Sequence, residues 1–407
     1  MLSRRQFIAR SGSLISMASC VPTMLCRAAR AAAASRDAPV LVVIQLDGGN
    51  DGLNTVVPYA DDAYVKARSK LHVPAKDVHK LSDSLGLHPR MRAAKELFDD
   101  GRLAIVQGVG YPNPDRSHFR SMRIWQTATF DDAAHNGYGW LGRSLDGDAA
   151  RQNAAEAAAV YVGEEQAPVA LWGRRSVTTA LSQIDDLTLS RGTPPRRTST
   201  IDRVTSASGD ESLRQFVTRQ VVSAYAAANQ IERRQRTSST TGGPSYPDTT
   251  LAARLRVVSQ LLKSGSAARV FYAIQSGYDT HAAQVYTHGQ LLAEFSQAIK
   301  AFLDDLQATE LSERVIVLAF SEFGRRVQEN DSLGTDHGAA GPVFLAGKRV
   351  TGGLIGPMPD LAKLDAGDLP MTTDFRQIYA TLLDKWLGID SQAILGGTYQ
   401  PLPLLTG

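Results

Sequence analysis

The stretch Val40–Gly52, with the sequence VLVVIQLDGGNDG, decides the fold class of this chain. Its first half is a largely apolar run without alternation, which is typical of a strand buried on both faces of a parallel sheet. The glycines that follow allow a sharp turn and bring Asp47 to the carboxyl end of that strand. Ligands of open α/β sheets bind outside such strand ends, so this turn is a candidate site.

Three further apolar runs of strand length have the same form, and each ends in a polar or glycine-rich turn. They cover residues 103–106, 270–274 and 315–320. Helical patterns separate the strands, and they cover residues 91–98, 117–128, 213–228, 251–263, 284–306 and 374–387. Strands that alternate with helices predict a doubly wound, mostly parallel sheet in a three-layer α/β/α fold.

The N-terminus has the features of an export signal. Residues 3–8, SRRQFI, contain an adjacent arginine pair followed by two apolar residues, as in twin-arginine signals. The apolar stretch 11–25 is too short to span a bilayer, and the alanine-rich run 28–34 suits a cleavage zone. We expect a signal peptide over 1–36 that the twin-arginine translocase recognises, and a periplasmic or secreted domain over 37–407. That domain would carry a helical or loop insertion around 190–250.

The charge and the cysteines belong largely to this leader. The chain has a formal net charge of +3, but residues 1–36 hold six arginines and no acid. Because the remainder is slightly acidic, we expect no nucleic-acid binding. Both cysteines, Cys20 and Cys26, lie in the leader, so the mature chain is expected to have no disulfide and no thiolate metal ligand. No later apolar run is long enough to predict a transmembrane segment.

Acidic and imidazole side chains gather at the predicted strand ends and in a late loop. Each of these side chains also has a structural explanation that needs no metal, such as a capped turn, a helix cap or a surface ion pair. Carboxylates and imidazoles that meet at one sheet edge suit zinc, manganese or iron. As a set they predict a metal site whose ligands are Asp47, Asp279, His281, Glu322, Asp336 and His337.

Ser117 is the candidate nucleophile, because it stands where a loop becomes a helix. A helix N-terminus favours a bound phosphate, and a neighbouring metal can activate the hydroxyl. A helix cap without a catalytic role is the alternative, and His118 could act in its place. Arg116 and Arg325 are expected to hold an anionic substrate. His288 could lie behind the metal ligands.

Five segments in this order resemble a bacterial secreted family called domain of unknown function 1501. They are 46–54 (LDGGNDGLN), 116–119 (RSHF), 278–281 (YDTH), 321–325 (SEFGR) and 335–338 (TDHG), and the resemblance spans about Pro39 to Leu387. The family belongs to the alkaline-phosphatase-like superfamily, which contains phosphatases, sulfatases and phosphomutases. The resemblance therefore implies an alkaline-phosphatase-like fold.

The same resemblance implies roles for individual residues. Asp47 matches a metal ligand after the first strand, and Ser117 matches a nucleophile at a helix start. Asp279 and His281 match the ligands of one metal, to which His337 could add the last imidazole. Where the superfamily has Asp-His for a second metal, this chain has Glu322 followed by Phe323, so an imidazole is missing. One ion, two ions or none are compatible with this pattern, and zinc or manganese is expected.

Three functions follow as alternatives. The favoured one is an exported metal-dependent hydrolase of phosphate or related esters, acting on an anionic small molecule or an envelope component. The others are a non-catalytic periplasmic binding or assembly factor and an envelope polysaccharide-modifying enzyme. A formylglycine sulfatase is disfavoured, because residues 117–120 (SHFR) lack the required proline and the mature chain lacks cysteine.

Overall fold

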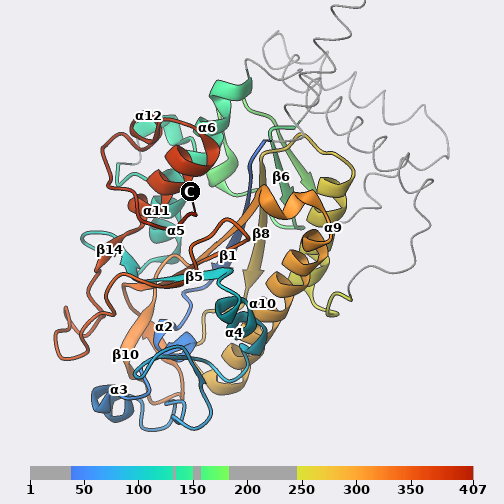
Figure 1. The fold of residues 1–407 in the computed structure, drawn as a ribbon. Helices are drawn as coiled ribbons and strands as arrows, with labels where there is room; N and C mark the ends of the chain where they lie inside the picture. Colours follow the sequence, from blue (N-terminus) through green and yellow to red (C-terminus); the bar gives the residue numbers. More distant parts are fainter. Residues whose placement is uncertain (1–37, 132–133, 150–156, 183–244, 407) are drawn as a thin grey trace, which may run out of the picture. The chain divides into compact units, whose positions relative to one another are not determined.

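The structure is a computed structural model that describes residues 38–131, 134–149, 157–182 and 245–406 (Figure 1). The expected signal peptide over 1–36, the helix expected at 213–228 and most of the expected insertion around 190–250 lie outside the described residues. These three expectations stay predictions.

β1 (Val40–Asp47) is a strand, as predicted, and it runs through the middle of the main sheet. It pairs in parallel with β8 (Val270–Ser276) on one side and with β9 (Val315–Phe320) on the other. Within the described residues the order across the sheet is β13 (Gly353–Ile355), β5 (Leu103–Gly110), β12 (Gly341–Ala346), β9, β1, β8, β6 (Ala159–Val162) and β7 (Thr178–Leu181), with β14 (Thr373–Asp374) beside β5.

β12 is the exception to the parallel arrangement, and the sequence did not predict it. It inserts between β5 and β9 and is antiparallel to both, whereas the other strand pairs of this sheet are parallel. Its apolar run, residues 343–346, is short and follows a glycine-rich loop, so the sequence pattern does not indicate a strand there. The predicted mostly parallel α/β fold is confirmed.

The side chains of β1 alternate between two cores, one on each face of the sheet. Val42 and Ile44 pack with the helices of one layer, and Leu41 and Val43 with those of the other. The first layer contains α4 (Arg92–Asp99), α9 (Thr250–Lys263) and α10 (Gln284–Gln307); the second contains α5 (His118–Thr127), α6 (Trp140–Ala149) and α11 (Phe375–Thr381) (Figure 1). Burial on both faces explains why this strand carries no polar alternation.

Smaller elements complete the described part of the chain. The predicted helix 374–387 is divided into α11 and a π-helical segment over Leu382–Leu387. The remaining short elements are α2 (Gly52–Thr55), β2 (Val56–Val57), α3 (Asp62–Ala67), β3 (His79–Lys80), β4 (Gly86–Leu87), β10 (Arg325–Glu329), β11 (Thr335–His337) and α12 (Ser391–Leu395), with single 3₁₀ turns at Ala134–Gly137, Val169–Leu171 and Glu310–Glu313. β10 and β11 form an antiparallel hairpin directly after β9.

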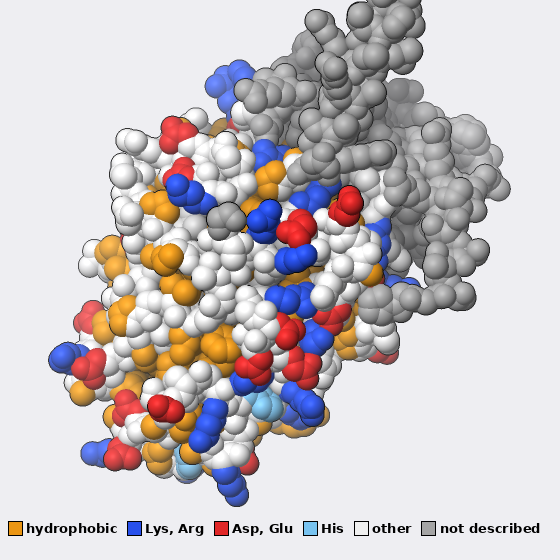
Figure 2. Space-filling view, viewed as in Figure 1, with side chains coloured by type: hydrophobic (Ala, Val, Ile, Leu, Met, Phe, Trp, Pro, Cys, Tyr) orange, Lys and Arg blue, Asp and Glu red, His pale blue; other side chains and the backbone are white. Residues whose placement is uncertain are grey.

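The surface charge and the length of the helices relate to two predictions, the absence of nucleic-acid binding and the absence of a transmembrane segment. On the face drawn in Figure 2, Lys and Arg side chains are interspersed with Asp and Glu rather than gathered into a basic stripe. The absence of nucleic-acid binding stays a prediction. Among the described residues, no helix combines the length and the apolar character needed to cross a membrane.

A buried ion pair connects the turn after β1 with the β10–β11 hairpin. Nη1 of Arg68 lies 2.6 Å from Oδ2 of Asp51, and both side chains are fully buried. Arg68 also donates hydrogen bonds to the carbonyl oxygens of Arg326 (2.9 Å) and Val327 (2.7 Å). Burial raises the pKa of Asp51, but the charge and hydrogen bonds of Arg68 outweigh it and lower this pKa to about 2.

This ion pair predicts an acid-sensitive contribution to stability. The pKa of Asp51 is depressed in the folded state, so its contribution is present above about pH 4 and is lost as the pH falls through about 2. It should amount to about 2 kcal/mol. We expect Asp51→Asn to lower the free energy of unfolding at pH 7 by about 3 kcal/mol, because Arg68 remains buried without a counter-charge. The variant should lose less additional stability between pH 4 and pH 2 than the unmodified protein.

Urea denaturation at several pH values measures both effects. Asp99→Asn is the control, because Asp99 belongs to an exposed ion pair with Lys95 whose loss should change stability by less than about 1 kcal/mol. The same acid dependence in Asp51→Asn and in the unmodified protein would contradict the prediction.

Candidate metal centre

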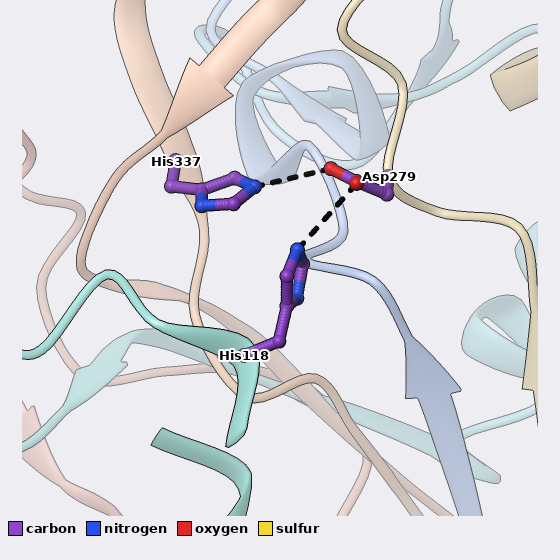
Figure 3. A group of neighbouring side chains, drawn as sticks. All are labelled: His118, Asp279 and His337. Atoms are coloured by element: carbon purple, nitrogen blue, oxygen red, sulfur yellow. Dashed lines mark hydrogen bonds and ion pairs between the residues drawn. The ribbon is translucent and has the colours of Figure 1, made fainter. Parts of the chain in front are cut away.

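Asp279 lies among three imidazoles in the loop that follows β8. Its Oδ1 is 3.1 Å from Nε2 of His281 and 3.1 Å from Nε2 of His337, and its Oδ2 is 3.5 Å from Nε2 of His118. Nε2 of His281 and Nε2 of His337 are 2.9 Å apart. Figure 3 shows His118 and His337 directed at the Asp279 carboxylate from different parts of the chain. Segments that are far apart in sequence therefore meet at this point.

The second ring nitrogen of each imidazole is held by an acceptor. The Nδ1 atoms lie 2.8 Å from Oε1 of Glu322 for His118, 3.2 Å from Oδ1 of Asp336 for His281, and 2.8 Å from the carbonyl oxygen of Arg116 for His337. An acceptor at Nδ1 places one ring hydrogen there, so a neutral ring that binds a cation would present its lone pair at Nε2. Imidazoles that bind metals in proteins are oriented in this way.

The spacing of these atoms fits a single cation. One ligand atom each from His118, Asp279 and His337 lie within 4.8 Å of one another. Metal–ligand bonds of about 2.0–2.1 Å in a tetrahedral site would separate ligand atoms by roughly 3.3 Å, and the 3.1 Å between Oδ1 of Asp279 and Nε2 of His337 is close to that separation. Nε2 of His118 is buried and has no hydrogen-bond partner within the described part of the chain. A set of nitrogen and oxygen donors suits zinc or manganese.

The electrostatics of the cluster also favour a cation. Burial raises the pKa of Asp279, but hydrogen bonds from Arg325 and His337 outweigh it and lower this pKa to about 2. The hydrogen bond to Glu322 raises the pKa of His118, against the effect of burial. Asp279 is therefore ionised at neutral pH. The same negative charges that favour a protonated His118 would favour a metal ion bound to the neutral ring.

Glu322 and Asp336 lie behind the imidazoles, although we expected them to be ligands. Glu322 is 1% exposed and accepts hydrogen bonds from the backbone N–H of Gly48 (3.0 Å) and the hydroxyl of Ser321 (3.0 Å). Asp336 accepts from Nδ2 of Asn330 at 3.2 Å as well as contacting His281. These contacts assign the two carboxylates to orienting histidines.

Asp47 stands next to the cluster but outside the group of three possible ligands. Its Oδ1 accepts a hydrogen bond from Nε2 of Gln45 at 2.8 Å. Burial raises the pKa of Asp47, and the charge of Glu322 raises it further. A role for Asp47 as a ligand stays a prediction.

Arg325 does not face a substrate, contrary to expectation. Its side chain is fully buried, and Nη2 lies 2.7 Å from Oδ1 of Asp279. Its other donors are used by the carbonyl oxygens of Gly48, Gly49, Tyr278 and Thr335. Arg325 thus holds the Asp279 carboxylate and the turn after β1 together, and its complete burial keeps it away from a substrate anion.

Arg116 and Ser117 lie at the start of α5. The guanidinium of Arg116 contacts Oδ2 of Asp368, with Nη2 at 2.5 Å and Nε at 2.9 Å, so much of its charge is already paired. Ser117 is exposed, and its backbone N–H donates to Oδ1 of Asp115 at 2.7 Å. Its side chain does not cap the helix, so the hydroxyl is not used for that purpose. Its role as a nucleophile stays a prediction.

Phe323 stands where the resemblance described above implies an imidazole. It is 3% exposed, and its ring centroid lies 5.0 Å from that of His118 and 4.8 Å from that of His337. Gly49 has a φ of +80°, and a Cβ there would come within 2.3 Å of the Phe323 ring. This aromatic ring packs against two candidate ligands and offers no donor, so the cluster fits one ion better than two.

A pocket of about 540 Å³ lies beside the loop that leads into α5, and none of the candidate ligands lines it. Arg116, whose carbonyl contacts His337, lines it, as does Ala339, two residues after His337. The walls also include Tyr111, Asn113, Asp368 and Met371. A mixed apolar and polar pocket of this size suits a small organic group.

The positions of His288 and His118 in the structure were only partly predicted from the sequence. His288 is 1% exposed, and its Nε2 lies 2.9 Å from Oδ1 of Asn50. Burial lowers the pKa of His288 to about 3, so its ring is neutral at pH 7. A place behind the metal ligands stays a prediction for this residue. His118 was expected as a catalytic alternative and instead lies among the possible ligands. Its position at the start of α5, after β5, is the one signal in the sequence that could have indicated this.

The cluster predicts zinc binding that depends on its histidines. We expect His337→Gln to weaken zinc binding by more than about 100-fold, because even the loss of an outer contact to a metal ligand costs about 10- to 100-fold. Competition with a chromophoric chelator measures the affinity. His72→Gln is the matched control, because Nδ1 of His72 contacts the carbonyl oxygen of Arg68 at 3.0 Å, away from the cluster. Equal zinc affinity in both variants would rule out this centre.

Comparison with known proteins identifies the family but no activity. Similar solved structures include a sulfatase from Pseudoalteromonas sp. (11% identity, covering 90% of this chain and 71% of that chain, TM-score 0.37) and the phosphonate monoester hydrolase of Agrobacterium radiobacter (10%, 88% and 78%, 0.34). A third is a protein in the alkaline phosphatase superfamily from Vibrio parahaemolyticus (10%, 86% and 67%, 0.36). At these TM-scores no property of those proteins is transferred to this chain. No curated protein matches it. The model of a family described as "Protein of unknown function (DUF1501)" matches residues 38–400, and the chain therefore belongs to the DUF1501 family.

Proposed function

We propose that this chain is an exported, metal-dependent hydrolase of phosphate or related esters. The observation that carries the proposal is the approach of three imidazole Nε2 atoms to one ionised carboxylate, Asp279, with each ring held from behind by an acceptor. An ion pair or a packing contact alone does not require three rings in this orientation. The arrangement is the one that metal-binding histidines need.

The residues of the cluster divide into those that hold the ion and those that hold the ligands. His118, Asp279 and His337 would bind it, with His281 beside them, while Glu322 and Asp336 keep two of the rings in place. A bound divalent cation such as zinc or manganese would polarise the ester and offset the charge that develops on its oxygens. Arg325 keeps Asp279 ionised and oriented whether or not the ion is present.

The start of α5 would receive the anionic part of the substrate. The first backbone N–H groups of a helix attract phosphate, and α5 also carries His118. Ser117 would attack the ester or position a water there. The organic part of the substrate, from a small molecule or an envelope component, would lie in the 540 Å³ pocket beside Arg116.

A non-catalytic binding or assembly factor is the second candidate, and a specific contact favours it. The Arg325 guanidinium is already paired with Oδ1 of Asp279 at 2.7 Å, which supplies the positive charge that a metal would otherwise bring. Phe323 in place of an imidazole points the same way. On this alternative the protein would fold without metal and turn over no ester.

Ester hydrolysis by the metal-loaded protein tests the proposal. We expect turnover of p-nitrophenyl phosphate with zinc or manganese, and a loss of at least about 100-fold in kcat/KM in Asp279→Asn, because a metal contributes several kcal/mol of charge stabilisation. Asp331→Asn, in the exposed turn of the β10–β11 hairpin, is the matched control and should keep full activity. A comparable loss in Ser117→Ala would identify the nucleophile, and a small loss would indicate attack by water. A folded protein that binds no metal and hydrolyses no ester would favour the binding factor.

Export by the twin-arginine translocase is part of the proposal and has its own test. Changing both arginines of the signal, Arg4→Lys with Arg5→Lys, should retain the full-length chain in the cytoplasm. The matched control is Arg10→Lys, which leaves the pair intact and should be exported. Fractionation and immunoblotting of a bacterial host distinguish the two. Normal export of the double variant would show that another route is used.

A further inference from the structure

We propose that Gln284 is a positioning residue that holds the two ligand-bearing loops of the metal centre at the separation needed for binding. The first loop carries Asp279 and His281, and the second carries His337. The inference rests on the function proposed above, because it concerns the same centre. Gln284 itself contacts no candidate ligand side chain and is fully buried at the first position of α10.

A single oxygen of Gln284 is bonded to both loops. Oε1 accepts a hydrogen bond from the hydroxyl of Thr280 at 3.0 Å and another from the hydroxyl of Thr335 at 2.6 Å. Thr280 stands between Asp279 and His281, and Thr335 stands two residues before His337. The backbone N–H of Thr335 also donates to the carbonyl oxygen of Thr280 at 3.2 Å. Moving either loop would therefore break a bond to the same amide.

The orientation of the Gln284 amide is determined by the buried ion pair beneath it. Nε2 of Gln284 donates to Oδ2 of Asp51, which Arg68 holds ionised. An ionised carboxylate can only accept hydrogen bonds, so the amide nitrogen must face Asp51 and the amide oxygen must face the two threonines. The chain of contacts runs from Arg68 through Asp51 and Gln284 to both loops. These contacts fix the partly exposed side chains of the two loops relative to the fully buried pair of Arg68 and Asp51.

Buried hydrogen bonds also stabilise a fold, so the test must separate positioning from stability. Asn54 offers a matched control, because it is a buried amide bonded to the same Arg68 and to Tyr64, and it touches neither loop. Thr280→Val and Thr335→Val each remove one of the two bonds to Gln284 and retain a side chain of similar size. These single-bond variants keep the test decisive if the Gln284 variant does not fold.

The experiment measures zinc affinity and melting temperature for the full chain and for Gln284→Met, Asn54→Leu, Thr280→Val and Thr335→Val. We expect Gln284→Met and Asn54→Leu to melt at similarly reduced temperatures. Of these two variants, only Gln284→Met should weaken zinc binding, by about tenfold or more, with a changed visible spectrum of the cobalt-substituted protein. Each threonine variant should lose part of this affinity. Combining Thr335→Val with Gln284→Met should weaken binding little further, because both act through one bond.

The outcomes separate this inference from the proposed function. Zinc binding by the unmodified protein, with equal affinity in Gln284→Met and Asn54→Leu, would overturn the role of Gln284 and leave the metal centre intact. Unchanged affinity in both threonine variants would overturn it as well. If the unmodified protein does not bind zinc, the metal centre itself fails, and the positioning role fails with it.

Discussion

The parallel pairing of β1 with β8 and β9 is the constraint on which the rest of the molecule depends. Its register sets Asp47 opposite Ser276 and Gln45 opposite Phe320, so three strands end at the same edge of the sheet. The turns that follow must then pack against one another. One close approach is at Gly48, where φ is +119° and a Cβ would lie 2.4 Å from the backbone nitrogen of Asp279. Only glycine fits there without moving Asp279.

Around this edge of the sheet, buried charged side chains hold the partly exposed residues of the cluster in place. Arg325 and Arg68 are both fully buried, and each binds backbone carbonyls together with one carboxylate. Burying a guanidinium is favourable only when its donors are satisfied, so each arginine requires the turns around it to keep their positions. The imidazoles and Asp279 above them stay partly open to solvent. This division provides a rigid support beneath an accessible site, which is what metal binding and substrate access both need.

Much of the fold and part of the site could be predicted from the sequence. The apolar runs at 40–46 and 315–320 match β1 and β9 closely, because strands buried on both faces leave an uninterrupted apolar pattern. β12 was missed because its apolar run is short. At the site, Asp279, His281 and His337 come together as expected. Arg325 and Glu322 were misplaced, since an isolated Arg or Glu in a sequence does not indicate whether its side chain will be buried beneath a turn or face a ligand.

The sequence by itself determined the strand ends at which acidic and imidazole side chains occur, because hydrophobic periodicity is a local property of the chain. Only the tertiary structure decided which of these side chains face a common point and which stand behind them. Glu322 and Asp336 orient histidines, Arg325 fixes Asp279, and Gln284 joins two loops that are more than fifty residues apart. These roles depend on the direction of each side chain after strands from distant segments have paired, and no local pattern records that direction.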